Sequence, residues 1–183
     1  MLLARARLIR ALGASMLVNL NIIMINVSSI SELPNKPAVY ALYGGRKRSL
    51  HVVYVGIAES LRRRIIQHLV TRDSSVATGT SAVHLNPDYV TEIRWWEHSD
   101  FADLPFREAA EMVAFEVLDP ALRSRGVATG RAKQLCSDAK FRERMRLLFS
   151  GEASGRLTIP NLQYALKRIA ELERRVAEFE KGK

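Results

Sequence analysis

The segment 54–68 of this 183-residue chain predicts a strand that ends in a glycine turn and runs directly into a basic helix. It begins Tyr-Val-Gly, and from Leu61 apolar residues recur at every fourth position, the spacing of a buried helix stripe. Arg64 and His68 are also four apart, so they are neighbours on one side of that helix. A guanidinium beside an imidazole at a strand end can hold a phosphate and move a proton. By itself, however, the stretch is more typical of a solvated basic helix that carries a chance histidine.

A strand-like run that starts at Ala38 precedes this segment and predicts a β-hairpin with it. A short linker led by two glycines separates the two runs. Tyr40 lies four residues before the linker and Tyr54 five residues after it, so their rings can lie close across the ladder, directly or diagonally. Much further along, Glu111 lies in a helical pattern, and Pro120 fits a helix stop.

Taken together, these residues resemble the GIY-YIG endonuclease family. The resemblance covers roughly residues 33–125, a domain-sized stretch of about a hundred residues. Each three-residue signature is weak alone, whereas the ordered set with its spacing is fairly specific. The first signature appears as Ala38-Val39-Tyr40 and the second as Tyr54-Val55-Gly56, and the family's arginine, histidine and metal-binding glutamate fall on Arg64, His68 and Glu111.

Two positions depart from the family pattern. Ala38 replaces the first glycine, a mild change within a strand. The family often carries an asparagine shortly after the proline, whereas this chain reads Pro120-Ala-Leu-Arg123. The supporting role of that asparagine is therefore unfilled or taken by another residue.

The resemblance implies an α+β fold, with a small three-stranded antiparallel sheet flanked by helices. It also implies a metal-dependent endonuclease that hydrolyses DNA phosphodiester bonds. Glu111 would bind a single Mg²⁺ or Mn²⁺ ion, since magnesium keeps most of its waters and needs few protein ligands. Arg64 would neutralise the scissile phosphate and Tyr40 would deprotonate the attacking water. Tyr54 would position water or phosphate, and His68 would share the proton transfer.

Two other interpretations stay open at this point. The same fold can serve as an inactive nucleic-acid-binding module, which the missing asparagine would allow. Alternatively, the chain is a basic helical adaptor whose C-terminal apolar stripe recruits a partner.

The net charge of +9 favours polyanionic partners, with DNA first and RNA not excluded. Cys136 is the only cysteine, so there is no disulfide framework, and a reducing, cytoplasmic setting is the simpler interpretation. The basic residues expected to contact the DNA backbone are Arg46, Lys47, Arg48, Arg62, Arg63, Arg131 and Lys133.

The composition predicts three segments. Residues 1–26 form an N-terminal extension, with Met16 as an alternative start; its apolar run is too short and too polar for a membrane span. Residues 27–125 form the nuclease-like domain, and residues 126–183 a basic helical extension.

Within these segments, a loop is expected over 72–87 and a strand over 91–98, with two tryptophans on opposite faces. The pattern also predicts that residues 131–149 are helical. A final helix after Pro160 carries an apolar stripe, which fits either a coiled-coil seam that forms a homodimer or packing back on the domain.

Overall fold

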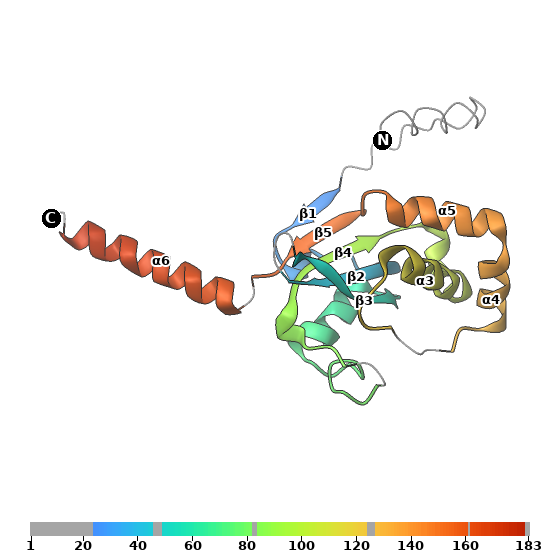
Figure 1. The fold of residues 1–183 in the computed structure, drawn as a ribbon, viewed down its shortest axis with the longest axis horizontal. Coiled ribbons are helices and arrows are strands. Elements are labelled where there is room, and N and C mark those ends of the chain that lie inside the picture. The colour runs from blue at the N-terminus through green and yellow to red at the C-terminus, as the bar shows by residue number, and fades with distance from the viewer. Residues whose placement is uncertain (1–23, 46–48, 82–83, 124–126, 161, 182–183) are drawn as a thin grey trace, which may run out of the picture.

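The computed structural model describes residues 24–45, 49–81, 84–123, 127–160 and 162–181. Its strands form one mixed sheet in the order β1-β5-β4-β2-β3 (Figure 1). The pair β1–β5 is parallel, and the other neighbouring pairs are antiparallel. The strands are β1 (Ile25–Val27), β2 (Ala38–Gly44), β3 (His51–Ala58), β4 (Val90–Trp96) and β5 (Gly155–Thr158).

The prediction of a three-stranded sheet is wrong, although its three antiparallel strands are present as β3, β2 and β4. The described residues add β5 beside β4 and β1 beside β5. A strand of four residues such as β5 is too short to show a hydrophobic period, so the sequence pattern does not reveal it. A Cβ atom at Gly155 would lie 2.0 Å from the Trp95 ring, so glycine is what lets β5 approach β4 at this point.

Helices and loops cover both faces of the sheet. On one face, α3 (Leu104–Leu118), α4 (Gly130–Ser137) and α5 (Ala139–Ser150) pack over one set of strand residues. On the other face lie α2 (Leu61–Ile65) and the loop that precedes β4. Trp95 and Trp96 belong to opposite faces, and both are buried, so neither ring is available to stack on a base.

The basic segment 131–149 is helical, as predicted, and it forms two helices, α4 and α5. Asp138 separates them and caps α5, because its carboxylate accepts the Phe141 amide at 2.7 Å. The break lets both α4 and α5 pack against α3. Residues expected to form a separate extension therefore add two helices and a strand to the same core and sheet as β2–β4.

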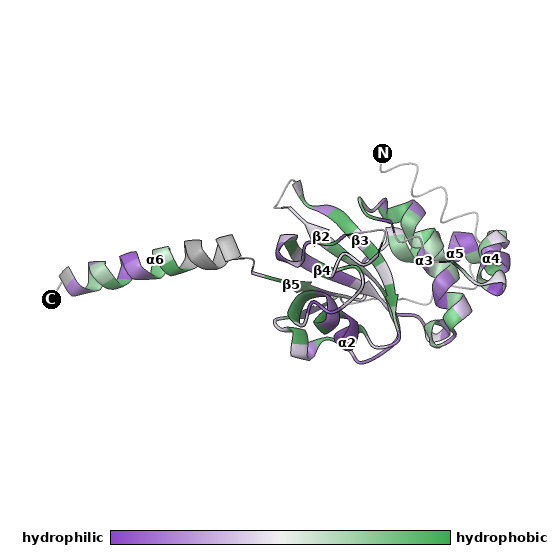
Figure 2. Ribbon diagram, turned by 90° about the horizontal axis from the view of Figure 1, so that it is seen from below, coloured by the Kyte–Doolittle hydropathy of each residue, from purple (hydrophilic) through white to green (hydrophobic). Residues whose placement is uncertain are grey.

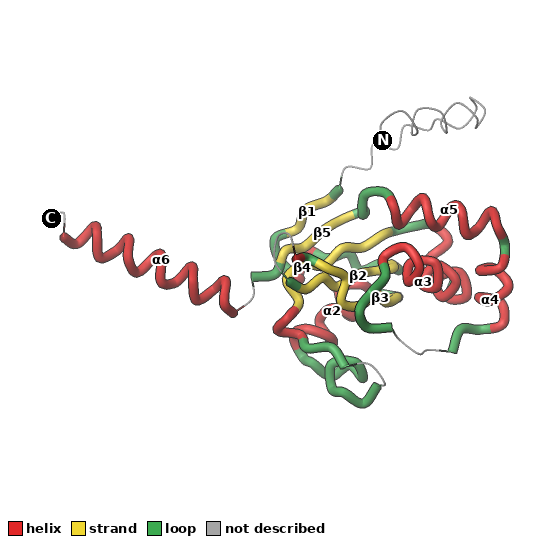
Figure 3. The backbone as a smooth tube through the Cα atoms, in the orientation of Figure 1, coloured by secondary structure: helices red, strands yellow, loops and turns green. Residues whose placement is uncertain are grey.

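Short 3-10 turns connect several elements: η1 (Ile30–Glu32), η4 (Pro87–Tyr89) and η5 (Ser99–Ala102). Arg107 on α3 is buried and holds η5 by donating to the carbonyls of Phe101 and Ala102. Figure 3 shows the long loop expected over 72–87, which follows the π-helical turn η3 (Ile66–Val70).

The last helix, α6 (Leu162–Lys181), extends away from the body of the molecule (Figures 1 and 2). At the other end of the chain, the last residues of the predicted extension 1–26 belong to β1 and so to the sheet. Residues 1–23 of that extension lie outside the described part. Of the helices in the described ranges, none is both long and apolar enough to cross a membrane.

Candidate active site

Tyr40 and Tyr54 lie side by side on the α2 face of the β2–β3 hairpin. Tyr40 pairs with Gly56 across the ladder and Tyr54 with Leu42, so the two rings are diagonal neighbours with centroids 6.3 Å apart. Both tyrosines are almost fully buried. A Cβ atom on Gly56 would lie 2.7 Å from the Tyr40 hydroxyl and 2.8 Å from the Tyr54 ring. The absence of a side chain at Gly56 therefore gives the two rings their space.

His68 completes this aromatic cluster from the π-helical turn η3. The Thr71 amide closes the widened turn by donating to the Ile66 carbonyl at 3.0 Å. Such turns change the direction of the side chains that follow, and they are frequent at functional sites. His68 is fully buried, with its ring 5.9 Å from that of Tyr40 and 5.8 Å from that of Tyr54. Its Nε2 lies 2.7 Å from the Tyr40 hydroxyl, within hydrogen-bond distance.

Ser74, in the loop after η3, holds the other ring nitrogen of His68. Its Oγ lies 2.7 Å from Nδ1 and also accepts the Ala77 amide at 3.2 Å. Burial is the main cause that lowers the pKa of His68 to about 4, and the positive charge of Arg64 is the second. The imidazole is therefore neutral at pH 7, with one nitrogen protonated and the other accepting. If Nδ1 carries the proton towards Ser74, Nε2 is free to accept the phenol proton of Tyr40.

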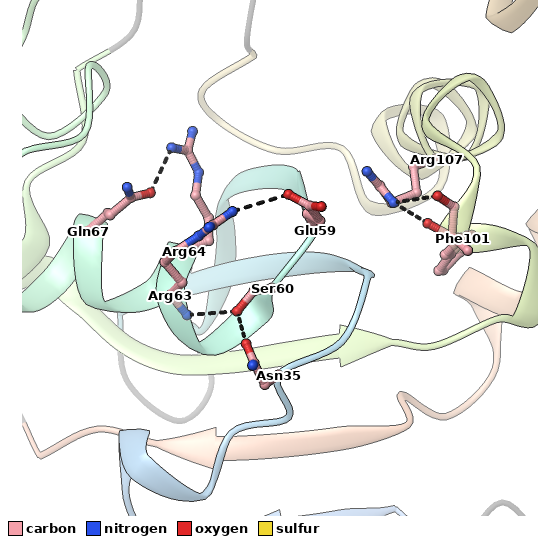
Figure 4. Close-up of polar contacts among 9 residues, drawn as sticks. Asn35, Glu59, Ser60, Arg63, Arg64, Gln67, Phe101 and Arg107 are labelled. Atoms are coloured by element: carbon pink, nitrogen blue, oxygen red, sulfur yellow. Dashed lines mark hydrogen bonds and ion pairs between the residues drawn. The ribbon is translucent and has the colours of Figure 1, made fainter.

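Arg64 joins the cluster from the end of α2. Its Nη1 donates to Gln67 at 3.4 Å, whereas the neighbouring Arg63 turns to Glu59 at 3.2 Å (Figure 4). Burial lowers the pKa of Arg64. Its interactions with the phenol groups of Tyr40 and Tyr54 raise the pKa by more, so the pKa lies above its ordinary value. Arg64 thus keeps its charge at the edge of a buried aromatic cluster, where it can offer donors to a phosphate.

Tyr40 is held as a neutral phenol. Burial raises its pKa well above the ordinary value, and the opposing effect of Arg64 is smaller. A phenolate is therefore scarce at pH 7. Tyr40 can act in proton transfer only if it passes on its own proton as it receives another, and His68 is placed to accept it.

Glu111 supplies the acid of the site from the middle of α3. Burial raises the pKa of its carboxyl to about 7, the neighbouring Glu108 acts in the same direction, and the Arg64 charge opposes both. Arg64 therefore acts electrostatically on Glu111, Tyr40 and His68 alike. A carboxyl that is half-ionised at pH 7 gains from a bound cation, which favours the charged form.

The segment after α3, where the family asparagine is missing, is tied to β3 by its backbone. The amides of Ala121 and Leu122 donate to Val52 and Val53 at 3.0 and 2.9 Å, and Leu122 forms a parallel bridge with Tyr54. Main-chain hydrogen bonds thus hold this segment beside the tyrosine cluster, where the family pattern would place an asparagine.

The structure gathers Tyr40, Tyr54, Arg64 and His68 in one cluster, and Glu111 lies within electrostatic reach of Arg64. The expected DNA contacts are dispersed. Arg62 is committed to the fold, because its Nε donates to the Leu33 carbonyl at 2.8 Å. Arg63 is exposed and paired with Glu59 on α2. Arg131 and Lys133 are exposed on α4, and Arg131 lies 3.5 Å from Asp103. Arg46, Lys47 and Arg48 lie outside the described residues.

Two residues of the site are not among those that the sequence singled out for a role. Gly56 belongs to the second signature, but its packing role depends on a diagonal register that only the sheet defines. Ser74 lies in a loop whose sequence shows no hydrophobic period. It is six residues after His68, a separation that does not bring two side chains together on a helix. A polar residue shortly after the histidine is the only signal, and it is a weak one.

We compared the chain with family models, curated proteins and solved structures, and none matches.

Proposed function

We propose that this chain is a metal-dependent endonuclease of the GIY-YIG type that hydrolyses phosphodiester bonds in DNA. The observation that carries the proposal is the meeting of Tyr40, Tyr54, Arg64 and His68 in one cluster. These residues come from two strands and from consecutive helical turns. Glu111, from a third element, shares the electrostatic field of Arg64.

Arg64 is the phosphate-binding group in this proposal. Its guanidinium keeps its proton and is already oriented by neighbouring side chains, so little rotamer freedom is lost when a phosphate binds. As negative charge grows on the phosphate oxygens, a fixed cation at that place stabilises the transition state. A bound phosphate would also offset the effect of Arg64 on His68, which raises the basicity of the imidazole when substrate is present.

Tyr40 and His68 form a proton relay. The phenol oxygen takes a proton from the attacking water while its own proton moves to His68 Nε2, 2.7 Å away. Because the two transfers are coupled, Tyr40 does not have to ionise beforehand, which its raised pKa would prevent. Ser74 keeps the imidazole in the orientation that accepts this proton.

Glu111 is the candidate magnesium ligand. The described residues contain no cluster of three or more His, Cys, Asp or Glu side chains, and the proposed site rests on the Glu111 carboxylate. Magnesium fits such a site, because water and phosphate oxygens complete its coordination. When bound, the ion would supply charge stabilisation to the phosphate and the leaving oxygen. The raised pKa of Glu111 fits a carboxylate that is stabilised only when a cation is present.

Cleavage of plasmid and branched DNA, with and without Mg²⁺, tests the proposal. The Mg²⁺ concentration that supports half-maximal cleavage should also depend on pH. With a Glu111 pKa of about 7, protons compete with the metal below pH 7. We expect the half-maximal Mg²⁺ concentration to fall about fivefold from pH 6 to 7 and about twofold from pH 7 to 8. DNA binding without cleavage would support an inactive binding module, and cleavage of RNA alone would correct the substrate.

Ser74→Ala should lower kcat about tenfold while KM changes less than about twofold, since it removes the partner that orients His68. Ser74→Thr keeps a hydroxyl and should restore most of the rate. Nitrogen NMR of His68 gives a second readout, because loss of the Ser74 hydrogen bond should change the tautomer ratio. Unchanged kcat and an unchanged tautomer in Ser74→Ala would contradict the relay.

A further inference from the structure

The helix α6 presents an apolar stripe to solvent. It has 20 residues and stands clear of the sheet and of the helices that cover it (Figures 1 and 2). Along it Ile169, Leu172, Val176 and Phe179 are 50%, 44%, 56% and 74% exposed. An amphipathic helix of this length gains little stability from propensity alone, so its apolar side needs a partner.

The spacing of the stripe is that of a coiled coil. Ile169 and Val176 are seven apart and take position a of a heptad, and Leu172 and Phe179 take position d. Over these two heptads the apolar residues form a narrow stripe at a and d, which fits contact with a second helix better than a broad protein core. In parallel coiled coils, β-branched residues at a with leucine at d favour two strands, and here Ile169, Val176 and Leu172 fit that pattern, with Phe179 at the other d position.

The charges beside the stripe select the partner and its direction. Arg175 takes position g, and Glu173 and Glu180 take position e; one heptad earlier, the sequence places Arg168 at g. In a parallel, in-register pair, each g residue faces the e residue five positions later in the other helix, so Arg175 meets Glu180. The sequence offers Arg168 and Glu173 as a second such match. In an antiparallel pair, g faces g and e faces e, which brings like charges together.

We propose that α6 binds α6 of a second copy of this chain as a parallel, in-register coiled coil. A single sequence supplies both sides of the charge match, so no other protein is needed to explain the pattern. A membrane surface fits less well, because the polar side carries Glu173, Glu178 and Glu180 among its basic residues, and anionic lipid would repel them. The resulting dimer has a two-fold axis along the coiled coil and carries two copies of the sheet domain. This proposal stands independently of nuclease activity.

Charge reversal of the full-length chain tests the partner, with mass measured by light scattering and analytical ultracentrifugation. The wild type should be a dimer. Reversal at g (Arg168→Glu with Arg175→Glu) or at e (Glu173→Arg with Glu180→Arg) should each weaken the homodimer at least about tenfold, because facing residues become alike. Mixing the two variants should restore dimers that contain one chain of each. A monomeric wild type, or reversed variants that dimerise as well as the wild type, would overturn the proposal.

A matched control exchanges charges on the outer side of the same helix. Arg174 and Glu178, 3.9 Å apart within one helix, take positions f and c. Arg174→Glu with Glu178→Arg keeps the net charge and the intrahelical pair, so dimerisation should stay unchanged. A monomeric control with intact helicity would show that the effect is not specific to the e and g positions.

Spin labels at Ala170 and Ala177, both at position b, test the direction. They are introduced one at a time as cysteines into the full-length chain with Cys136→Ala, so that the native thiol is not labelled. A parallel, in-register dimer gives short and similar label-to-label distances at both sites. A short distance at one site and a distance longer by roughly 20 Å at the other would establish the antiparallel pair instead, because seven residues span about 10 Å of helix and both labels move apart.

Discussion

Glu111→Gln is expected to lower Mg²⁺-supported DNA cleavage at least about a hundredfold, while DNA affinity stays the same or rises slightly. The substitution keeps the shape of the side chain and removes the charge that would bind the metal, so transition-state stabilisation is lost. On the proposed DNA-binding surface, removal of a negative charge does not weaken phosphate binding electrostatically. Single-turnover cleavage and equilibrium binding on the same substrate separate the two effects.

The same variant has a stability signature that a surface glutamate would not give. The folded pKa of Glu111, about 7, lies above the ordinary value of 4.5, so its ionisation costs folding stability as the pH rises through this interval. Glutamine carries no such cost. Glu111→Gln should therefore be more stable than the wild type by roughly 1–3 kcal/mol at pH 8, with no gain at pH 4. Urea unfolding at both pH values measures it.

Glu116→Gln is the matched control on the same helix. Glu116 is exposed and pairs with Arg142 at 2.7 Å and with Arg146 at 3.2 Å, on the α5 side of α3. Its cleavage rate should stay close to that of the wild type, because exposed ion pairs of this kind contribute little. Equal rates in Glu111→Gln and the wild type would remove Glu111 from the site.

Arg64→Ala should also lower cleavage at least about a hundredfold, with only a few-fold loss of DNA affinity. Arg64 faces both phenols, and its charge acts on His68 and on Glu111, so its loss removes the cation that we propose binds the phosphate. Many other basic residues remain to hold the DNA backbone. Rates measured with saturating enzyme isolate the chemical step from binding.

Two further variants sharpen the test of Arg64. Arg64→Lys keeps the charge and loses the planar fork, so it should recover only part of the rate. Arg63→Ala removes the adjacent arginine, which turns away to Glu59, and should weaken binding slightly with kcat unchanged. Equal losses of kcat in Arg63→Ala and Arg64→Ala would mean that the basic helix acts only through its overall charge.

The spacing of residues along the chain was enough to predict the hairpin, the helix with Arg64 and the helix with Glu111. These are local features, since a strand alternates and a helix repeats within a few residues. Pro120 likewise marked the end of α3, which stops at Leu118. The diagonal approach of Tyr40 to Tyr54 was one of two arrangements that the hairpin allowed, and the ladder register decides between them.

Features that depend on distant parts of the chain could not be predicted in this way. The short strand β5 forms on the edge that β4 leaves, and β1 pairs with β5 in turn. Asp138 divides the predicted helical segment so that both α4 and α5 reach α3. The pKa values of His68 and Glu111 depend on burial, which no spacing encodes. The sequence by itself thus determined the local elements on which the candidate residues lie, and its family resemblance singled those residues out. Only the tertiary structure decided that they meet, that Ser74 supports them and how strongly they are charged, because packing and desolvation arise between segments far apart in the chain.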